Sequence, residues 1–320
     1  MKAKTIKAVL TKKCNEWLAS IDDEAIRAKA RAGTIVTGGC IASMLIGEKV
    51  NDFDIYFADK LTAWIVARYY VAKFEPKVAA GIRCGIIVAD EFGAEIATEG
   101  HARRANRIKI VVKSSGIATE RPYEYFEGSA TAEDAGSFVG EVMQDPGDIA
   151  DTYEATEDAA LATEDAMYRP VFLSTNAITL SGRIQIIIRF WGTAAEIHEN
   201  YDFVHCTNSW TCNDGKLLLR QPALESLLAR ELRYAGSKYP ICSLIRIRKF
   251  IKRGWTINAG QILKMCMQVS QLDLTDIAVL EDQLIGVDVA YFMEVIRAVR
   301  EKDPEKVNYA YLIEIIDRLF

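Results

Sequence analysis

The sequence of 320 residues lacks any hydrophobic run long enough to cross a membrane. A transmembrane helix needs roughly 18 or more apolar residues in succession, and unbroken runs such as the one over 63–67 are far shorter. The first 13 residues carry five lysines, but the long apolar segment of a signal peptide does not follow them. We therefore expect a cytoplasmic protein that does not associate with membranes.

The sequence also lacks paired cysteine motifs. Its seven cysteines are an odd number and none stand in a Cys-x-x-Cys arrangement, which argues against a disulfide framework and favours reduced thiols in the core. His198 and His205 lie near Cys206 and Cys212, but their spacing matches no common zinc pattern. Neither a Walker loop nor a dinucleotide fingerprint nor a Ser-His-Asp grouping is evident.

Basic residues are missing from one long segment. Residues 122–168 include no Lys or Arg but thirteen Asp and Glu residues. Their thirteen negative charges exceed the net charge of the whole chain, which is −5. The segment is rich in Ala, Thr and Gly and has no clear period, which indicates an acidic insertion. The region 216–264 has the opposite balance, with eleven basic residues against two acidic ones. A net charge of +9 on a helical region is typical of a surface that meets phosphates.

The remaining composition is that of a folded protein, with 50% hydrophobic and 26% charged residues. The length suggests about two domains. Apolar spacing predicts helices over 4–17, 21–32, 40–46 and 61–74, and strands over 33–37, 52–57, 83–88, 107–112, 177–180, 183–190 and 201–206. A helix is predicted over 194–200, and only helices are predicted after residue 221: 222–234, 242–253, 259–269, 275–284, 290–300 and 308–319. We predict an α+β domain over 1–215 and a helical domain over 216–320.

Two short motifs at strand ends carry the candidate chemistry. Gly38-Gly39 ends a strand and opens a helix, and backbone amides at a helix start form an anion site that glycine lets a ligand approach closely. Asp52 lies thirteen residues after Gly39, and Asp54 lies two residues farther. Residues i and i+2 of a strand share one face, so both carboxylates converge there and favour a divalent cation, Mg²⁺ being the natural choice for oxygen ligands.

The order of these motifs resembles the nucleotidyltransferases of the polymerase-beta superfamily, and most closely the tRNA CCA-adding enzymes and bacterial poly(A) polymerases. The resemblance rests on residues 37–47 with the Gly-Gly pair, on Asn51-Asp52-Phe53-Asp54-Ile55, and on the Arg-rich stretch 244–257 that ends in Gly-Trp-Thr-Ile. The stretch 183–203 is also similar to nucleotidyltransferase-related proteins of tailed phages. The fold that the resemblance implies is a polymerase-beta-like head, with a mixed sheet and flanking helices, followed by a helical neck and body.

The resemblance implies Mg²⁺-dependent transfer of a nucleoside monophosphate from an NTP such as ATP to a hydroxyl group, most simply the 3′ end of an RNA. Asp52, Asp54 and a third carboxylate would hold two Mg²⁺ ions, for which Mn²⁺ could substitute. For the third carboxylate we favour Asp202, between two aromatic residues, with Glu95 as its rival. The nucleotide would contact a set of glycine, serine and basic side chains: Gly38, Gly39, Ser43, Arg246, Lys249 and Arg253, with Arg189 a weaker candidate.

Two other functions stay open. The chain carries Ala42-Ser43 where CCA-adding enzymes carry Arg-Asp, and Glu281-Asp282 is not followed by the arginine of their base-reading motif. These differences fit a protein that keeps the fold as a structural or interaction protein, for example one associated with a phage virion. A nucleotidyltransferase that modifies a protein or a small molecule is the other alternative.

Overall fold

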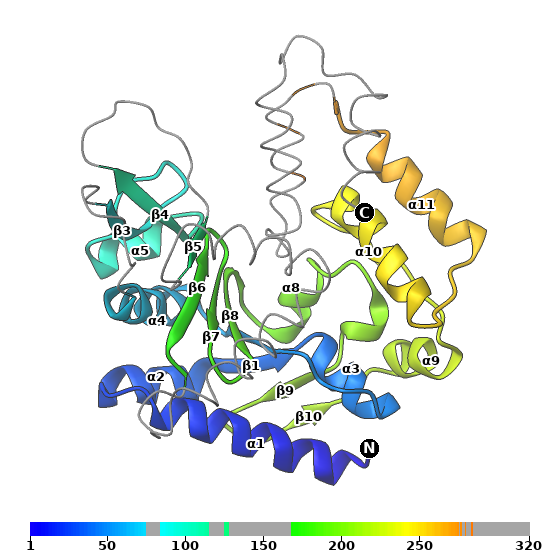
Figure 1. Cartoon of the computed structure of the whole chain (residues 1–320), viewed down its shortest axis with the longest axis horizontal. Coiled ribbons are helices and arrows are strands. Elements are labelled where there is room, and N and C mark those ends of the chain that lie inside the picture. The colour runs from blue at the N-terminus through cyan, green and yellow to red at the C-terminus, as the bar shows by residue number, and fades with distance from the viewer. Residues whose placement is uncertain are drawn as a thin grey trace. The chain divides into compact units, whose positions relative to one another are not determined.

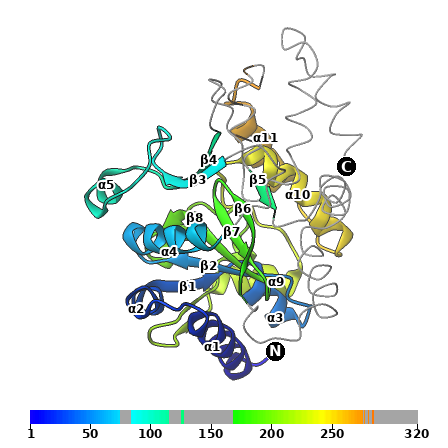
Figure 2. The ribbon, with the colours of Figure 1, turned by 60° about the vertical axis from the view of Figure 1, so that its left-hand side comes forward.

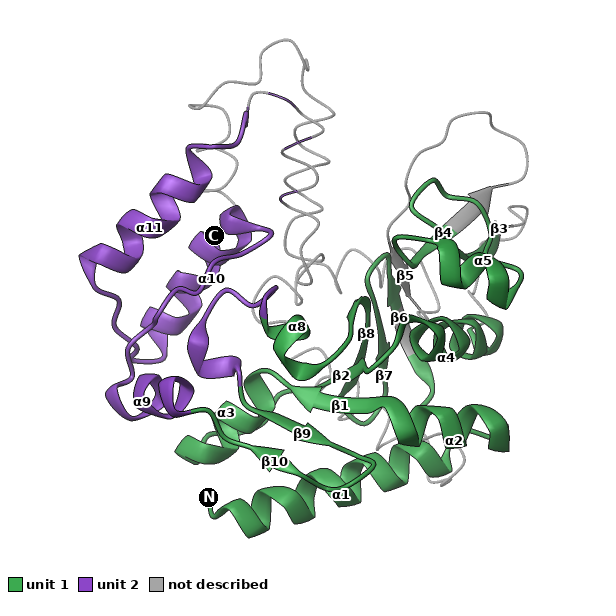
Figure 3. Ribbon diagram, turned by 180° about the vertical axis from the view of Figure 1, so that it is seen from behind, with its two compact units in different colours: residues 1–138, 147–198, 208–220 green, residues 139–146, 199–207, 221–320 purple. Residues whose placement is uncertain are grey.

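A computed structural model describes residues 1–74, 84–114, 125–127 and 168–274, together with residues 276, 279 and 283. The chain divides into two compact units (Figure 3). Unit 1 comprises residues 1–138, 147–198 and 208–220, and unit 2 comprises 139–146, 199–207 and 221–320. Most of the acidic insertion, most of the helix predicted over 275–284, and the helices predicted over 290–300 and 308–319 lie outside the described residues, and so does the Glu281-Asp282 motif.

Unit 1 is a mixed α+β unit built on one large sheet (Figures 1 and 2). Within the described residues the strand order is β10-β9-β1-β2-β8-β7-β6-β5. The strands are β1 (Thr34–Thr37), β2 (Phe53–Phe57), β5 (Tyr125–Glu127), β6 (Pro170–Ser174), β7 (Ala177–Leu180), β8 (Ile184–Trp191), β9 (Ser209–Thr211) and β10 (Leu217–Leu218). β2 and β8 pair in parallel, and the other neighbours pair antiparallel.

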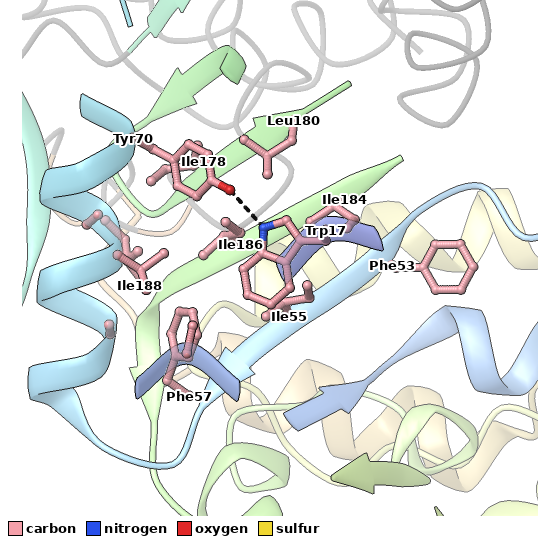
Figure 4. Packing of buried hydrophobic residues seen from close by; sticks show 14 of the residues in the cluster. Trp17, Phe53, Ile55, Phe57, Tyr70, Ile178, Leu180, Ile184, Ile186 and Ile188 are labelled. Carbon is pink, nitrogen blue, oxygen red and sulfur yellow. Dashed lines mark hydrogen bonds between the residues drawn. The ribbon is translucent and has the colours of Figure 1, made fainter. Parts of the chain in front are cut away.

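Helices cover one face of this sheet. Its apolar residues form a single cluster with α1 (Ala3–Ala19), α2 (Glu24–Gly33), α3 (Gly39–Ile46) and α4 (Lys60–Lys73). Figure 4 shows Trp17 of α1 and Tyr70 of α4 above the sheet isoleucines, joined by a hydrogen bond of 2.8 Å from the indole N–H to the phenol oxygen. Ile184, Ile186 and Ile188 of β8 point into this cluster, and Gln185 and Ile187 therefore lie on the opposite face of the sheet.

Local sequence signals explain where the helices begin and end. The Asp23 side chain caps α2 by accepting from the Ile26 N–H at 3.0 Å, and Asp59 caps α4 by accepting from Thr62. Gly47 ends α3 in the left-handed conformation, with φ of 81°, as its position predicts. The second helix was predicted from residue 21, but it begins at Glu24, so that Asp23 is its cap.

A second, two-stranded sheet consists of β3 (Cys84–Ala89) and β4 (Lys109–Ser114), with α5 (Glu99–Arg104) between them in sequence. The two strand predictions here are confirmed, whereas α5 was not predicted. Asp90, at the end of β3, accepts from the Phe92 and Ala94 N–H groups and lies 2.8 Å from His101 Nε2 of α5. These bonds fix the loop that links the strand to the helix.

Unit 2 contains α9 (Gln221–Ala229), α10 (Pro240–Lys252) and α11 (Ala259–Val269). The prediction of a helix over 222–234 was too long, because Arg230 adopts φ of 48° and ends it. The prediction of a strand over 201–206 was wrong. Phe203 makes a single bridge with Tyr234, and a 3₁₀ helix follows over Val204–Cys206. In unit 1, α8 (Ala194–His198) is two residues shorter than its prediction.

In the described part of the chain, no helix is long and apolar enough to span a membrane. Six described cysteine side chains take part in no disulfide. The expectation of core thiols holds for Cys14, Cys40 and Cys242, which are buried, but Cys266 is exposed on α11. Met265, the residue before it on α11, is buried.

Candidate functional site

The Gly-Gly turn connects β1 to α3. Gly38 is the N-cap of the helix, with φ of 98° and ψ of −153°, a conformation that only glycine adopts readily. Gly39 is the first helical residue, and a Cβ placed on it would meet no atom within 4 Å. The turn therefore presents the first amides of α3 beside open space, which is the local geometry that an anion requires.

The aspartate pair lies at the same end of the sheet as this turn. β1 and β2 are antiparallel, with Val36 opposite Ile55, so the last residue of β1 meets the first part of β2. Asp52 directly precedes β2 and Asp54 is its second residue, and both are partly buried. Because Ile55 points into the core cluster, Asp54 lies on the opposite face of the sheet. The structure thus brings Gly38, Gly39 and Asp54 together.

Gln185 of β8 stands directly opposite Asp54 in the parallel ladder. Thr179 of β7 stands opposite Gln185 in turn. One row of side chains on the face that carries the aspartate is therefore polar across three adjacent strands. Sequence reasoning missed Gln185, although its place between two isoleucines indicated that it faces away from the core. Only the register between β2 and β8 identifies Asp54 as its neighbour.

A buried hydrogen-bond network lies behind the Gly-Gly turn. The Thr37 hydroxyl donates to the Asn208 carbonyl at 2.7 Å and lies 2.8 Å from His198 Nε2. Because its one proton is directed to Asn208, the hydroxyl accepts from a protonated Nε2. Burial, aided by the charge of Arg220, lowers the pKa of His198 to about 4. No motif in the sequence indicated these three residues as a group.

Ser43 lies in α3, four residues after Gly39. Residues i and i+4 of a helix share one face, so Ser43 lies on the same side of the helix as Gly39, one turn farther from the sheet. Its side chain is partly buried, and its backbone carbonyl accepts from Glu48 N–H at 2.9 Å. The predicted triphosphate contacts Gly38, Gly39 and Ser43 therefore share the first two turns of one helix.

Asp202 belongs to unit 2. Its Oδ2 accepts from Arg246 Nη1 at 2.5 Å, and its Oδ1 accepts from the Phe203 N–H at 3.1 Å. The side chains of Asp202 and Arg246 are 15% and 27% exposed, so this ion pair is shielded from solvent. The structure brings the predicted third carboxylate together with one of the predicted phosphate-binding arginines.

The other predicted basic residues lie on and just after α10. Lys249 is three residues beyond Arg246, on the same side of the helix, and both are partly buried. Arg253 is the C-cap, and its carbonyl accepts from Arg230. Arg189, the weaker candidate, lies in unit 1 on β8, with its guanidinium over the Phe190 ring.

Glu95, the rival third carboxylate, is exposed and forms an isolated bridge with Ala89 at the small β3–β4 sheet. It is therefore on no strand of the sheet that carries Asp54. Within the described residues, no group of three or more His, Cys, Asp or Glu gathers closely enough to hold a metal ion. A complete three-carboxylate cluster is not formed there. Two carboxylates still suit Mg²⁺, which is commonly held by one or two of them together with substrate phosphates.

Comparisons with known proteins identify the family. The model of the Gabija anti-defense 2 family matches residues 8–230, which is more than two thirds of the chain and runs from α1 to the end of α9. No curated protein matches the sequence.

Two solved structures are similar at a low level. One is the Thermotoga maritima CCA-adding enzyme complexed with tRNA, with a TM-score of 0.39 and 14% identity over 95% of this chain and 53% of that chain. The other is a tRNA-processing enzyme with CTP, with a TM-score of 0.34 and 12% identity over 89% of this chain and 54% of that chain. The chain thus spans about half the length of each, and such scores carry no argument about fold or activity. The match to the family model is the finding that identifies the chain, which belongs to the Gabija anti-defense 2 family.

Proposed function

We propose that the chain opposes the Gabija defence as a Mg²⁺-dependent nucleotidyltransferase, which moves a nucleoside monophosphate from an NTP to a hydroxyl group. The anti-defence part rests on the family. The catalytic part rests on one observation: the Gly-Gly turn and Asp54 lie at the same end of the sheet. The turn directly follows β1, which pairs with the strand of Asp54, β2, and the start of its helix has open space beside it.

Each of these residues has a role in the proposal. The amides of Gly38 and Gly39 bind triphosphate oxygens, because unpaired N–H groups and the helix dipole favour anions there. Asp52 and Asp54 hold the Mg²⁺ that accompanies the triphosphate. When bound, the ion offsets charge on the attacking and leaving oxygens. The network of Thr37, His198 and Asn208 keeps the end of β1, and therefore the Gly-Gly turn, in place.

The acceptor that we propose is an RNA 3′ end. What supports it is the basic side of α10, where Arg246 and Lys249 lie together, with Arg253 at its end. Contacts between basic side chains and phosphates release counterions, so RNA retention should weaken steeply with salt. If the acceptor were instead a hydroxyl group of a protein, transfer would not require RNA.

The test is transfer of label from each α-labelled NTP, with Mg²⁺ or Mn²⁺, to RNA or protein acceptors. An Asp52→Asn/Asp54→Asn double variant removes two charges at the site while keeping the side-chain shapes. A Glu24→Gln/Glu99→Gln double variant removes the same charge at exposed positions and serves as the matched control. We expect labelled RNA with wild type and with the control, and none with the aspartate variant. Label on protein would change the acceptor, and no label with any acceptor would contradict catalysis.

A specific observation favours one second function, a non-catalytic anti-defence protein that acts by binding. Asp202 is engaged by Arg246, and the described residues gather no third carboxylate with Asp52 and Asp54. Phage growth in bacteria that carry the Gabija defence separates the two functions. If the Asp52→Asn/Asp54→Asn variant still protects the phage, binding rather than transfer is the anti-defence activity.

A further inference from the structure

Within the described residues, the chain passes between the two units at three places: after His198, before Asn208 and after Arg220. These three residues of unit 1 are bonded into one group through Thr37. The Thr37 hydroxyl lies 2.8 Å from His198 Nε2 and donates to the Asn208 carbonyl at 2.7 Å. The side-chain oxygen of Asn208 accepts from the Arg220 N–H at 2.9 Å. Each described passage of the chain therefore begins or ends at this group of four residues, which we call the junction.

Three members of the junction are buried. Thr37 and Asn208 are 0% exposed, and His198 is 6% exposed. Arg220 has an exposed side chain and joins the junction through its backbone N–H. Hydrogen bonds that are shielded from water are strong, and loss of one partner leaves the other buried and unpaired, which costs more than the bond itself. The junction therefore holds the ends of the connecting segments in a fixed arrangement.

The junction acts directly on the Gly-Gly turn. Thr37 is the last residue of β1, where it lies opposite Ser209 of β9. Gly38 follows it with the φ of 98° that starts the turn. A binding site needs its groups to be held within about 0.5 Å by the hydrogen bonds behind them. The position of Thr37 therefore sets the position of the amides of Gly38 and Gly39.

The segment 199–207 runs from one member of the junction to another and is bonded to the helix that we propose for RNA. Asp202 lies four residues after His198 and six residues before Asn208. The carboxylate of Asp202 accepts from Arg246 of α10 at 2.5 Å. A few residues of backbone therefore connect the basic side of α10 to the buried bonds of the junction.

We propose that the junction couples the binding of nucleotide to the binding of RNA, with His198 and Asn208 as positioning residues; this rests on the proposed function. A nucleotide at the Gly-Gly turn orders the turn, and through Thr37 it orders both ends of the segment 199–207. Arg246 is then already in place when an RNA phosphate arrives, so the RNA pays less ordering entropy. By reciprocity, bound RNA strengthens nucleotide binding by the same factor. The coupling is therefore positive.

The test is the affinity of the full chain for a fluorescent ATP analogue in Mg²⁺, measured with and without a short RNA. The RNA ends in a 3′-deoxynucleotide, so that both ligands are bound without transfer. We expect saturating RNA to lower the Kd for the analogue about fivefold in wild type, at the low end of ordinary coupling, and the analogue to lower the Kd for RNA by the same factor. Wild type that binds no analogue would contradict the proposed function and this inference with it. Binding of both ligands without coupling would overturn the inference alone.

Variants of the junction separate coupling from stability. Thr37→Val and His198→Leu each remove hydrogen bonds of the junction, and we expect both ligands to bind with a coupling factor near one. Thr37→Ser keeps the hydroxyl and His198→Gln keeps an N–H donor, so both should retain the coupling. Tyr70→Phe breaks another buried hydrogen bond of unit 1 and is the matched control. It should lower the melting temperature but keep the fivefold factor.

A purely structural role of the junction predicts a different result. Thr37→Val and His198→Leu would then lower the melting temperature as Tyr70→Phe does and leave the coupling factor unchanged, which would overturn the proposal. If Thr37→Val fails to fold or to bind nucleotide, His198→Leu decides the outcome, because it leaves the bond between Thr37 and Asn208 intact.

Discussion

The Gly-Gly turn offers a sharp contrast between two neighbouring glycines. Gly38→Ala puts a Cβ on a residue with φ of 98° and ψ of −153°. This region is essentially confined to glycine, and other residues there cost of order 1–3 kcal/mol. Since 1 kcal/mol changes the melting temperature of a domain of this size by about 2–4 °C, we expect Gly38→Ala to lower it by roughly 2–12 °C.

Gly39→Ala should behave in the opposite way. Gly39 is already helical, and its added Cβ would meet nothing within 4 Å. Replacing a helical glycine whose conformation alanine can adopt stabilises a protein by about 0.4–1 kcal/mol. The new methyl group would nevertheless occupy the space in which the triphosphate is proposed to lie. We therefore expect a melting temperature equal to or slightly above that of wild type, together with loss of nucleotide binding.

Thermal unfolding and titration with a fluorescent ATP analogue in Mg²⁺ test both variants. Gly47 lies at the far end of the same helix, has a positive φ like Gly38, and has open space around its Cβ position like Gly39. Gly47→Ala is therefore the control for backbone strain away from the proposed nucleotide site. It should lose stability but still bind nucleotide whenever it is folded. Undiminished binding by Gly39→Ala would refute the assignment of this space to phosphate. An unchanged melting temperature for Gly38→Ala would refute the strained geometry of the turn.

Three further predictions concern the core and unit 2. Tyr70→Phe removes the acceptor of the buried Trp17 N–H, which should lower the free energy of unfolding by about 1–3 kcal/mol in urea. Burial lowers the pKa of His205 to about 4, so the unfolded chain binds more protons and the contribution of His205 to stability should fall as pH drops from 6.5 towards 4, by at most about 1.4 kcal/mol per pH unit. His205→Phe should reduce the pH dependence of thermal melts by this share and leave the share of His198, whose pKa is lowered in the same way. Asp202→Asn should destabilise unit 2 by about 1–3 kcal/mol because Arg246 loses its charged partner; unchanged unfolding in urea would contradict the ion pair.

The sequence predicted those elements whose signals are local. Residues 61–74 have helical spacing, and α4 forms at Lys60–Lys73, directly after Asp59. Gly47 follows an apolar run and ends α3. Strand β2 was also predicted within one residue, because alternation and the flanking turn residues belong to the segment itself. In all these cases neighbouring residues contain the information.

Pairing between distant segments could not be predicted in the same way. Strands β9 and β10 are three and two residues long, too short to show a period. They form by pairing, β9 with the edge of β1 and β10 with β9. Asp202 was placed on a strand for its aromatic neighbours. Phe203 is indeed buried, but within unit 2, and the carboxylate pairs with Arg246, 44 residues away. The partner of Asp54 across the sheet depends on the register of β8, which no pattern within either strand specifies.

The parallel pairing of β2 with β8 also has a consequence for how the chain folds. Phe53 lies opposite Ile184, so more than a hundred residues must be synthesised between two adjacent central strands. The sequence separation is larger still for the pairing of β1 with β9, in which Val36 lies opposite Trp210. Closing such long loops precedes any gain from the contacts, and high contact order slows folding. The apolar strands β1 and β2, which pair with each other, therefore emerge from the ribosome well before β9 and β8, their other neighbours. We expect the nascent chain to require protection from aggregation until residue 211 has been translated.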